Sequence, residues 1–168
     1  MRGIMVSGIV LLTVACVAFT GCRQQAVEPE EPAMTQAKAE AAAREFMVAF
    51  DNALDSGDAA ALAELYTDEG RRYRPDEPPI IGKDAIRAGF LTFFEQYDVN
   101  VQDQVENVIL AGDVMIARGS FKGTRTPKAG GDPVQVSGHW IDYKRLQQDG
   151  SWKRVESMYV QDPAPPQE

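Results

Sequence analysis

The sequence has few of the residues that build disulfides, metal centres and thiol sites. Its 168 residues include two cysteines and one histidine, and both cysteines, Cys16 and Cys22, lie in or next to the first apolar stretch. The part of the chain that folds therefore has no cysteine for a disulfide, a metal site or a nucleophile. With His139 as the only imidazole, sites built from several histidines are excluded as well. We predict no metal and no cofactor.

Positive charge is also scarce. Lys and Arg number 17 against 25 Asp and Glu, which gives a net charge of -8. Nucleic-acid binders need a basic surface, so we expect no nucleic-acid partner. The one basic cluster, Arg71, Arg72 and Arg74, stands beside Asp76 and Glu77 and is interpreted as a locally neutral loop. A carboxylated ligand remains an alternative if Tyr73 lies between the arginine side chains.

The N-terminus has the layout of an export signal. Arg2 precedes the uncharged residues 4–19, a run shorter than the roughly 20 apolar residues of a membrane-spanning helix. The small residues Thr20 and Gly21 stand directly before Cys22. Residues 19–22 resemble the lipobox of bacterial lipoproteins, in which the cysteine becomes the lipidated first residue of the mature chain. An ordinary secretory signal or an uncleaved anchor is the alternative.

We accordingly predict four segments: a lipoprotein signal peptide at 1–21, an acidic Pro/Glu linker at 22–34, a folded domain at 35–162 and a disordered tail at 163–168. The linker combines two prolines with three glutamates and has almost nothing to bury. Lipidation of Cys22 would anchor the exported domain to a membrane of the bacterial cell envelope without a spanning helix.

The first half of the domain has helical periodicity. Apolar residues at offsets of three and four predict one helix over 34–56 and a third helix from about Lys83. Between them, Asp58 is expected to cap a short helix whose Leu62, Leu65 and Tyr66 face inwards. Three prolines between 75 and 79 predict a surface loop, with a short extra strand near 71–74 before it.

The second half changes to the period of two that is typical of strands. Alternating residues 99–110 switch parity midway, which predicts a bulge. Further strands are expected over 114–124, 134–147 and 152–161, with Asp149–Gly150 as a hairpin turn. We predict an α+β fold in which three helices pack on a curved, antiparallel four-stranded sheet, forming a cone with a cavity between the layers.

Short motifs lie in register over this domain: 65–68 (LYTD), 81–87 (IGKDAIR), 112–113 (GD), 117–121 (ARGSF), 126–128 (TPK), 138–140 (GHW) and 149–153 (DGSWK). They resemble the nuclear transport factor 2-like superfamily, in particular its SnoaL-like and domain-of-unknown-function 4440 branches. The resemblance implies a cone-shaped fold, a homodimer formed through the sheet and a cavity for a small molecule. It also implies ketosteroid isomerase-like or SnoaL-like acid–base chemistry for some members, although none of the motifs here matches their catalytic residues.

We therefore expect a lipid-anchored domain, either non-catalytic or of an activity that the sequence leaves open, that binds a small apolar or amphipathic ligand. The alternatives are a cofactor-independent isomerase or cyclase and a purely structural dimeric envelope module. The expected pocket residues are Tyr66, Tyr73, Phe90, Phe94, Arg118 and Trp140. Phe90, Phe94 and Trp152 have spacings that a simple core position explains equally well.

In the enzymatic alternative, Asp142 is the candidate base, with Tyr66 or Tyr73 as proton donor. The competing interpretation pairs Asp142 with Lys144 on a solvent or dimer face. His139 has the opposite strand parity and is expected at the surface or an interface rather than as a base. Trp140 and Ile141 make both parities of this strand partly apolar, so the sequence leaves open which face lines the cavity.

Overall fold

The helices begin at capping residues. The computed structural model describes residues 34–163. The first helix, α1 (Gln36–Asp55), follows Thr35, whose side chain accepts a hydrogen bond from the first turn. Asp58 caps α2 (Ala59–Glu64) through a 2.9 Å bond from the N–H of Ala61, and α3 (Lys83–Gln96) follows Gly82. These are the three helices that the sequence predicted.

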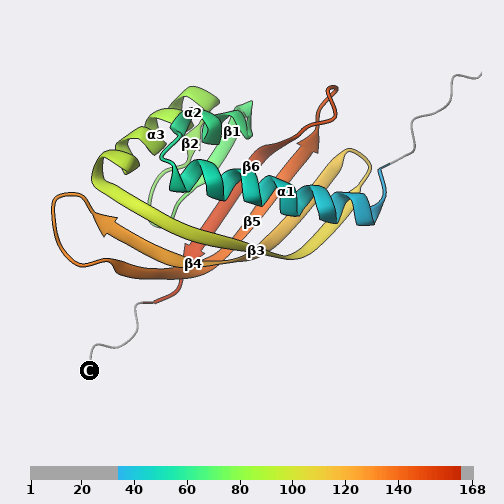
Figure 1. Cartoon of the computed structure of the whole chain (residues 1–168). Helices are drawn as coiled ribbons and strands as arrows, with labels where there is room; N and C mark the ends of the chain where they lie inside the picture. The colour runs from blue at the N-terminus through green and yellow to red at the C-terminus, as the bar shows by residue number, and fades with distance from the viewer. Residues whose placement is uncertain (1–33, 164–168) are drawn as a thin grey trace, which may run out of the picture. The chain divides into compact units, whose positions relative to one another are not determined.

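Six strands form one curved sheet, and the helices cover one of its faces (Figure 1). The strands are β1 (Tyr66–Tyr73), β2 (Ile80–Ile81), β3 (Tyr97–Ala111), β4 (Val114–Pro127), β5 (Val134–Leu146) and β6 (Trp152–Gln161). They lie in the order β2-β1-β6-β5-β4-β3. All neighbours are antiparallel except β1 and β6, which run parallel.

The predicted α+β fold and its antiparallel meander are confirmed, and two further strands extend the sheet. β1 is longer than the short strand expected near 71–74, because it pairs along the free edge of β6. The N–H of Arg154 donates to the carbonyl of Leu65 at 2.8 Å, which fixes the start of this pairing. Tyr66 consequently begins a strand instead of ending a helix, but its side chain is buried as the helical pattern implied.

The parity switch in β3 has its predicted cause. The register between β3 and β4 shifts between Val105 and Asn107, so Glu106 is an extra residue. This bulge lets Val101 before it and Val108 after it both reach the buried face, although they are seven residues apart.

The structure decides which face of β5 points inward. Trp140, Asp142 and Lys144 face the helices with at most 7% exposure, whereas Ile141 between them is 45% exposed. The prediction that Asp142 and Lys144 share one face is confirmed, and that face is the interior rather than a solvent or dimer surface.

The core has two apolar clusters under the helices. One joins the N-terminal half of α1 to the sheet and contains Phe46, Met47, Met115 and both tryptophans. The other joins α2 and α3 to β1 and β3 around Leu62, Tyr66, Ile86 and Phe90. Phe50 packs against both clusters, so this part of α1 marks the boundary between them.

Several predictions lie outside the described residues. They are the signal peptide 1–21, the lipidation site Cys22, the linker up to residue 33 and the tail beyond Pro163. Within residues 34–163, none of the helices is long and apolar enough to cross a membrane.

Candidate functional site

A cavity of about 140 Å³ lies between the helices and the inner face of the sheet. Residues of α1, α3 and five strands line it. Its aromatic residues are Phe50, Tyr66, Phe93, Phe121, Trp140 and Tyr159. Its charged residues are Arg72, Arg74, Asp103, Arg125, Asp142 and Arg154. The cavity therefore combines flat apolar walls with an unusual amount of buried charge.

Glycines on the sheet make room for the aromatic walls. A Cβ at Gly119 would lie 2.6 Å from the ring of Trp140, and one at Gly138 would lie 2.7 Å from the ring of Phe121. The indole N–H of Trp140 donates to the carbonyl of Ser120 at 3.3 Å. Both rings are thus held in place by residues of the neighbouring strand.

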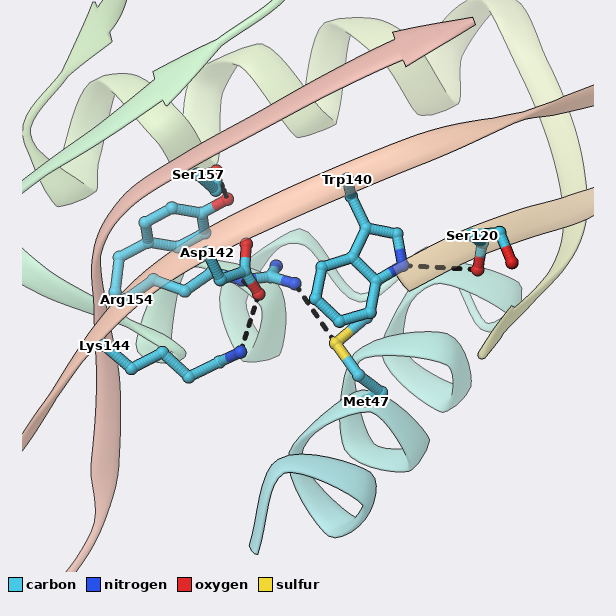
Figure 2. Close-up of polar contacts among 8 residues, drawn as sticks. Met47, Ser120, Trp140, Asp142, Lys144, Arg154 and Ser157 are labelled. Carbon is cyan, nitrogen blue, oxygen red and sulfur yellow. Dashed lines mark hydrogen bonds and ion pairs between the residues drawn. The ribbon is translucent and has the colours of Figure 1, made fainter. Parts of the chain in front are cut away.

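Three of the charged side chains next to the cavity form a closed network, which we call the ion cluster: Asp142, Lys144 and Arg154. One oxygen of Asp142, Oδ2, accepts hydrogen bonds from Lys144 Nζ at 2.7 Å and from Arg154 Nε at 2.8 Å. All three side chains are at most 4% exposed. Figure 2 shows the carboxylate of Asp142 facing Lys144, and Arg154 reaching Met47 on α1.

Aromatic rings complete the surroundings of the two cations in the ion cluster. Lys144 Nζ lies 4.5 Å from the ring centre of Phe46, and the Arg154 guanidinium lies 4.2 Å from that of Phe50. Cation–π contacts of this kind are worth more when water is excluded. The two cations are therefore held by α1 as well as by the sheet.

This network keeps Asp142 ionised. Burial by itself raises the pKa of the Asp142 carboxyl, but the charges of Arg154 and Lys144 and their hydrogen bonds outweigh it, and the pKa ends below its usual value. A general base works best with a pKa near the working pH. Asp142 is thus arranged as a structural anion.

A second pair of carboxyl groups behaves in the opposite way. Asp51 on α1 accepts a 3.1 Å hydrogen bond from the backbone N–H of Asp103, and its other oxygen, Oδ1, is buried with no partner among the described residues. Burial, together with hydrogen bonding to Asp51 and repulsion from it, raises the pKa of Asp103 to about 8. At pH 7 the Asp103 carboxyl is mostly neutral and can donate a proton or a hydrogen bond in the cavity.

Two arginines of the cavity lack an acidic partner within residues 34–163. The Arg72 guanidinium lies 4.3 Å from the ring centre of Phe90 and 5.7 Å from that of Tyr159. The Arg125 guanidinium lies 4.8 Å from the ring centre of Tyr97. Burial lowers the pKa of the Arg72 guanidinium, but arginine remains charged at neutral pH.

The family follows from a comparison with known proteins. Residues 43–155 match the model of the SnoaL-like domain. The chain belongs to the SnoaL-like family. No functionally curated protein matches it.

Solved structures share the fold of this SnoaL-like chain. A ketosteroid isomerase-like protein from Erwinia carotovora atroseptica is 27% identical with a TM-score of 0.67, over 76% of this chain and 96% of that one. A nuclear transport factor 2-like superfamily protein from Salmonella enterica is 12% identical with a TM-score of 0.67, over 77% and 94%. A conserved protein from Planctomyces limnophilus is 21% identical with the same TM-score, over 73% and 97%.

The residues predicted for the pocket divide into three groups. Tyr66, Trp140 and Asp142 line the SnoaL-like cavity. Phe90 and Phe94 belong to the apolar core beside it, where Phe90 is fully buried. Tyr73 ends β1 next to Met158 and is not among the residues that line the cavity.

Arg118 requires a correction, because it lies on the outer face of the SnoaL-like sheet. Its side chain is 58% exposed and bonds Glu106 at 3.2 Å. Inward positions on β4 are the odd-numbered residues Met115 and Ala117, so the even-numbered Arg118 points the other way. His139 is also exposed, with its ring 3.9 Å from Asp162.

The sequence interpretation did not find Asp51, Asp103 or Arg125 and gave Arg72 only a conditional role. Asp51 and Asp103 lie 52 residues apart and on different elements, so no local spacing relates them. Asp103 does share the strand parity of Val99 and Val101, and this parity was a usable sign that it points inward. Arg125 shares its parity with Phe121 in the same manner.

Proposed function

We propose that this protein is an exported, lipid-anchored member of the SnoaL-like family whose cavity binds a small apolar or amphipathic ligand. The observation that supports ligand binding is the cavity lined by aromatic rings, two of whose charged residues, Arg72 and Arg125, have no carboxylate partner among residues 34–163. A domain whose only role was structural would be expected to fill this space with its own side chains.

Blocking the cavity tests ligand binding. Val136→Trp places a large ring in the cavity, whereas Val134→Trp, two residues earlier on β5, changes an exposed position. A panel of apolar and amphipathic small molecules is titrated into each protein while the heat of binding is followed by calorimetry. Binding that the first variant abolishes and the second retains supports the proposal. Absence of any binding by the wild type would favour the structural module.

The proposed anchor rests on Cys22 behind the export signal at 1–21. Growth with a labelled fatty acid is expected to label the wild type and Cys16→Ser but not Cys22→Ser. The label should fractionate with a membrane of the cell envelope. Equal labelling of the Cys22→Ser variant would contradict lipidation at this residue.

We also propose a homodimer formed through the outer face of the sheet. Ile141, Met158 and Val160 are apolar residues on β5 and β6 that are 45%, 46% and 53% exposed. Native mass spectrometry of the unlipidated Cys22→Ser chain is expected to show a dimer that Met158→Glu dissociates. Ile109→Glu, at an exposed apolar position on β3, is the control that should leave the dimer intact.

A second candidate function is acid–base catalysis without a cofactor. The observation that favours it is the position of Asp103 in the cavity lining, where burial raises the pKa of its carboxyl to about 8, since a neutral carboxyl in an apolar site can donate to a developing oxyanion. In this candidate function the proposed donor is Asp103, because Lys144 and Arg154 hold Asp142, the base expected from the sequence, as a paired anion.

Catalysis of this kind is tested by following the exchange of α-hydrogens for deuterium in small ketones by NMR. Asp103→Asn is expected to abolish enzyme-dependent exchange. Asp98→Asn, at an exposed carboxylate on the same strand paired with Lys128, is expected to leave it unchanged. Equal exchange rates in wild type and Asp103→Asn would rule out the assignment.

A further inference from the structure

The charge of the cavity is opposite to the charge of the protein. The whole chain has a net charge of -8, yet four arginines and only two aspartates line the cavity. At neutral pH the carboxyl of Asp103 is mostly neutral, which leaves Asp142 as the single lining anion. The cavity is thus a positive site inside an acidic protein.

Two of the four arginines are already paired with a carboxylate of the protein. Arg154 donates to Asp142, and Arg74 forms an ion pair with Glu77. Arg72 and Arg125 have no carboxylate within ion-pair distance among residues 34–163, and aromatic rings are their closest charge-stabilising neighbours. A partly buried guanidinium that keeps its charge gains strongly from an anion, because the hydrogen bonds to that anion are charge-assisted.

The apolar walls next to Arg72 define the other half of the site. The Arg72 guanidinium approaches Tyr159, whose ring contacts that of Phe121 edge-on with centres 6.1 Å apart. A cavity of about 140 Å³ is close to the size that accommodates one benzene ring in an apolar protein interior, about 150 Å³. The available space thus fits a single ring beside the guanidinium.

We propose that the cavity binds a single-ring aromatic carboxylate, whose ring packs against Phe121 and Tyr159 and whose carboxylate pairs with Arg72, with Arg125 as the second cation. This inference rests on the proposed ligand-binding function and specifies its ligand class. Arginine suits the role because its planar donors match a carboxylate in a two-bond arrangement.

The ligand class is tested first on the unchanged site. The full chain carrying Cys22→Ser, which lacks the proposed lipidation site, is titrated calorimetrically with benzoate, with its neutral isostere benzamide and with acetate. Benzoate is expected to bind about 10- to 100-fold more tightly than benzamide, the range that a hydrogen bond to a charged group supplies. Acetate is expected to bind weakly, because it lacks the ring.

The strand that carries Arg72 also provides a matched control. Arg71 is the preceding residue, is half exposed and faces Glu156 at 3.9 Å on the other side of the strand. Arg72→Gln is expected to remove the preference for benzoate over benzamide, Arg125→Gln to reduce it and Arg71→Gln to leave it unchanged. Circular dichroism and the melting temperature establish that each variant is folded. If Arg72→Gln does not fold, the proposal is still tested by Arg125→Gln and by the relative affinities of benzoate, benzamide and acetate for the unchanged site.

The outcomes separate the two proposals. Benzamide binding as tightly as benzoate would overturn the carboxylate assignment and leave the ligand-binding cavity standing. Acetate binding as tightly as benzoate would overturn the aromatic part of the proposal. If none of the three binds and the wider panel of apolar ligands also fails, the proposed function falls with the inference.

Discussion

Two groups of charges border the same cavity, and they differ in how completely the protein satisfies them. In the ion cluster, Asp142, Lys144 and Arg154 bond one another and are almost fully buried. On the flanking strands β1 and β4, Arg72 and Arg125 have aromatic neighbours but no carboxylate among residues 34–163. The difference indicates that the first group holds the fold together and that the second is available to a ligand.

The energetics of burial explain this division. Removing an ion from water costs several kcal/mol, about the amount that a well-placed partner returns. The ion cluster has such partners from two strands and from the rings of α1. Arg72 bears part of this cost, because burial lowers the pKa of its guanidinium, and its neighbours are the rings of Phe90 and Tyr159. The carboxylate of the proposed ligand would supply the anionic partner that residues 34–163 do not provide.

The largest predicted effect is the loss of stability on breaking the ion cluster. Asp142→Asn leaves Lys144 and Arg154 buried without their anion. We expect the free energy of unfolding to fall by about 3 to 5 kcal/mol. Urea denaturation at pH 7 measures the change. The matched control is Asp113→Asn, which removes an exposed carboxylate 4.0 Å from Arg145 and should cost about 1 kcal/mol or less.

The pH dependence of this loss has a definite sign. The folded-state pKa of Asp142 lies below the ordinary 3.8, so its stabilising contribution is fully present above that pH and is lost as the pH falls through the folded-state value. The difference in free energy of unfolding between wild type and Asp142→Asn should therefore become smaller in strong acid. Equal stability of the two proteins at pH 7 would show that the ion cluster does not hold the fold.

Asp103 should produce the next largest effect, in the opposite direction. Its folded-state pKa of about 8 lies above the unfolded value of 3.8, so its proton stabilises the fold at low pH and this contribution is lost as the pH rises through about 8. Asp103→Asn has no charge to bury. We expect its free energy of unfolding at pH 9 to exceed that of the wild type by about 1 to 3 kcal/mol.

Urea denaturation at pH 5, 7 and 9 tests this prediction. The free energy of unfolding of Asp103→Asn should exceed that of the wild type by more as the pH rises. Asp98→Asn, at an exposed position near the start of β3, should have the wild-type stability at each pH. A constant difference across the three pH values would mean that Asp103 is already ionised at pH 5.

Local sequence patterns predicted most of the fold and little of the charge arrangement. The stripe on α1, the cap at Asp58 and the parity switch in β3 each depend on residues a few positions apart, and all three have their expected places. The pairing of β1 with β6 depends on an edge that only the assembled sheet provides. For that reason Tyr66 was assigned to a helix.

The candidate site depends even more on contacts between elements that are distant in the sequence. The parity of Trp140 and Asp142 was correct, but whether that face was the interior depended on where α1 packs. The partner of Asp142 that the sequence missed is Arg154, twelve residues away across a hairpin. Contacts between distant elements decide which charges are paired, so the sequence could name candidate residues without separating structural ions from binding ones.

The third prediction connects the two groups of charges through ligand binding. Ionisation of Asp103 near pH 8 adds a negative charge to the cavity, where Asp51 of α1, Asp142 of β5 and Arg154 of β6 act on it. Benzoate affinity is therefore expected to fall about two- to tenfold between pH 7 and pH 9. Calorimetric titration should show this fall in wild type and an unchanged affinity in Asp103→Asn, whereas benzamide binding should not respond to pH in either protein.

The smallest predicted effect concerns the hydroxyl of Tyr66, which either stabilises the fold or serves as a donor to the ligand. Its hydroxyl and that of Ser157 are 2.8 Å apart, and both residues are buried at the cavity wall. If the pair is structural, Tyr66→Phe and Ser157→Ala each lower the free energy of unfolding by about 1 kcal/mol. The double variant lowers it by less than the sum of the two single variants, and none of the three changes the affinity for benzoate. Tyr143→Phe, at the exposed hydroxyl that accepts from Arg145, is the control with little effect. A loss of benzoate affinity in Tyr66→Phe with unchanged stability would instead place this hydroxyl with Arg72 and Arg125, as a donor that the cavity offers to its ligand.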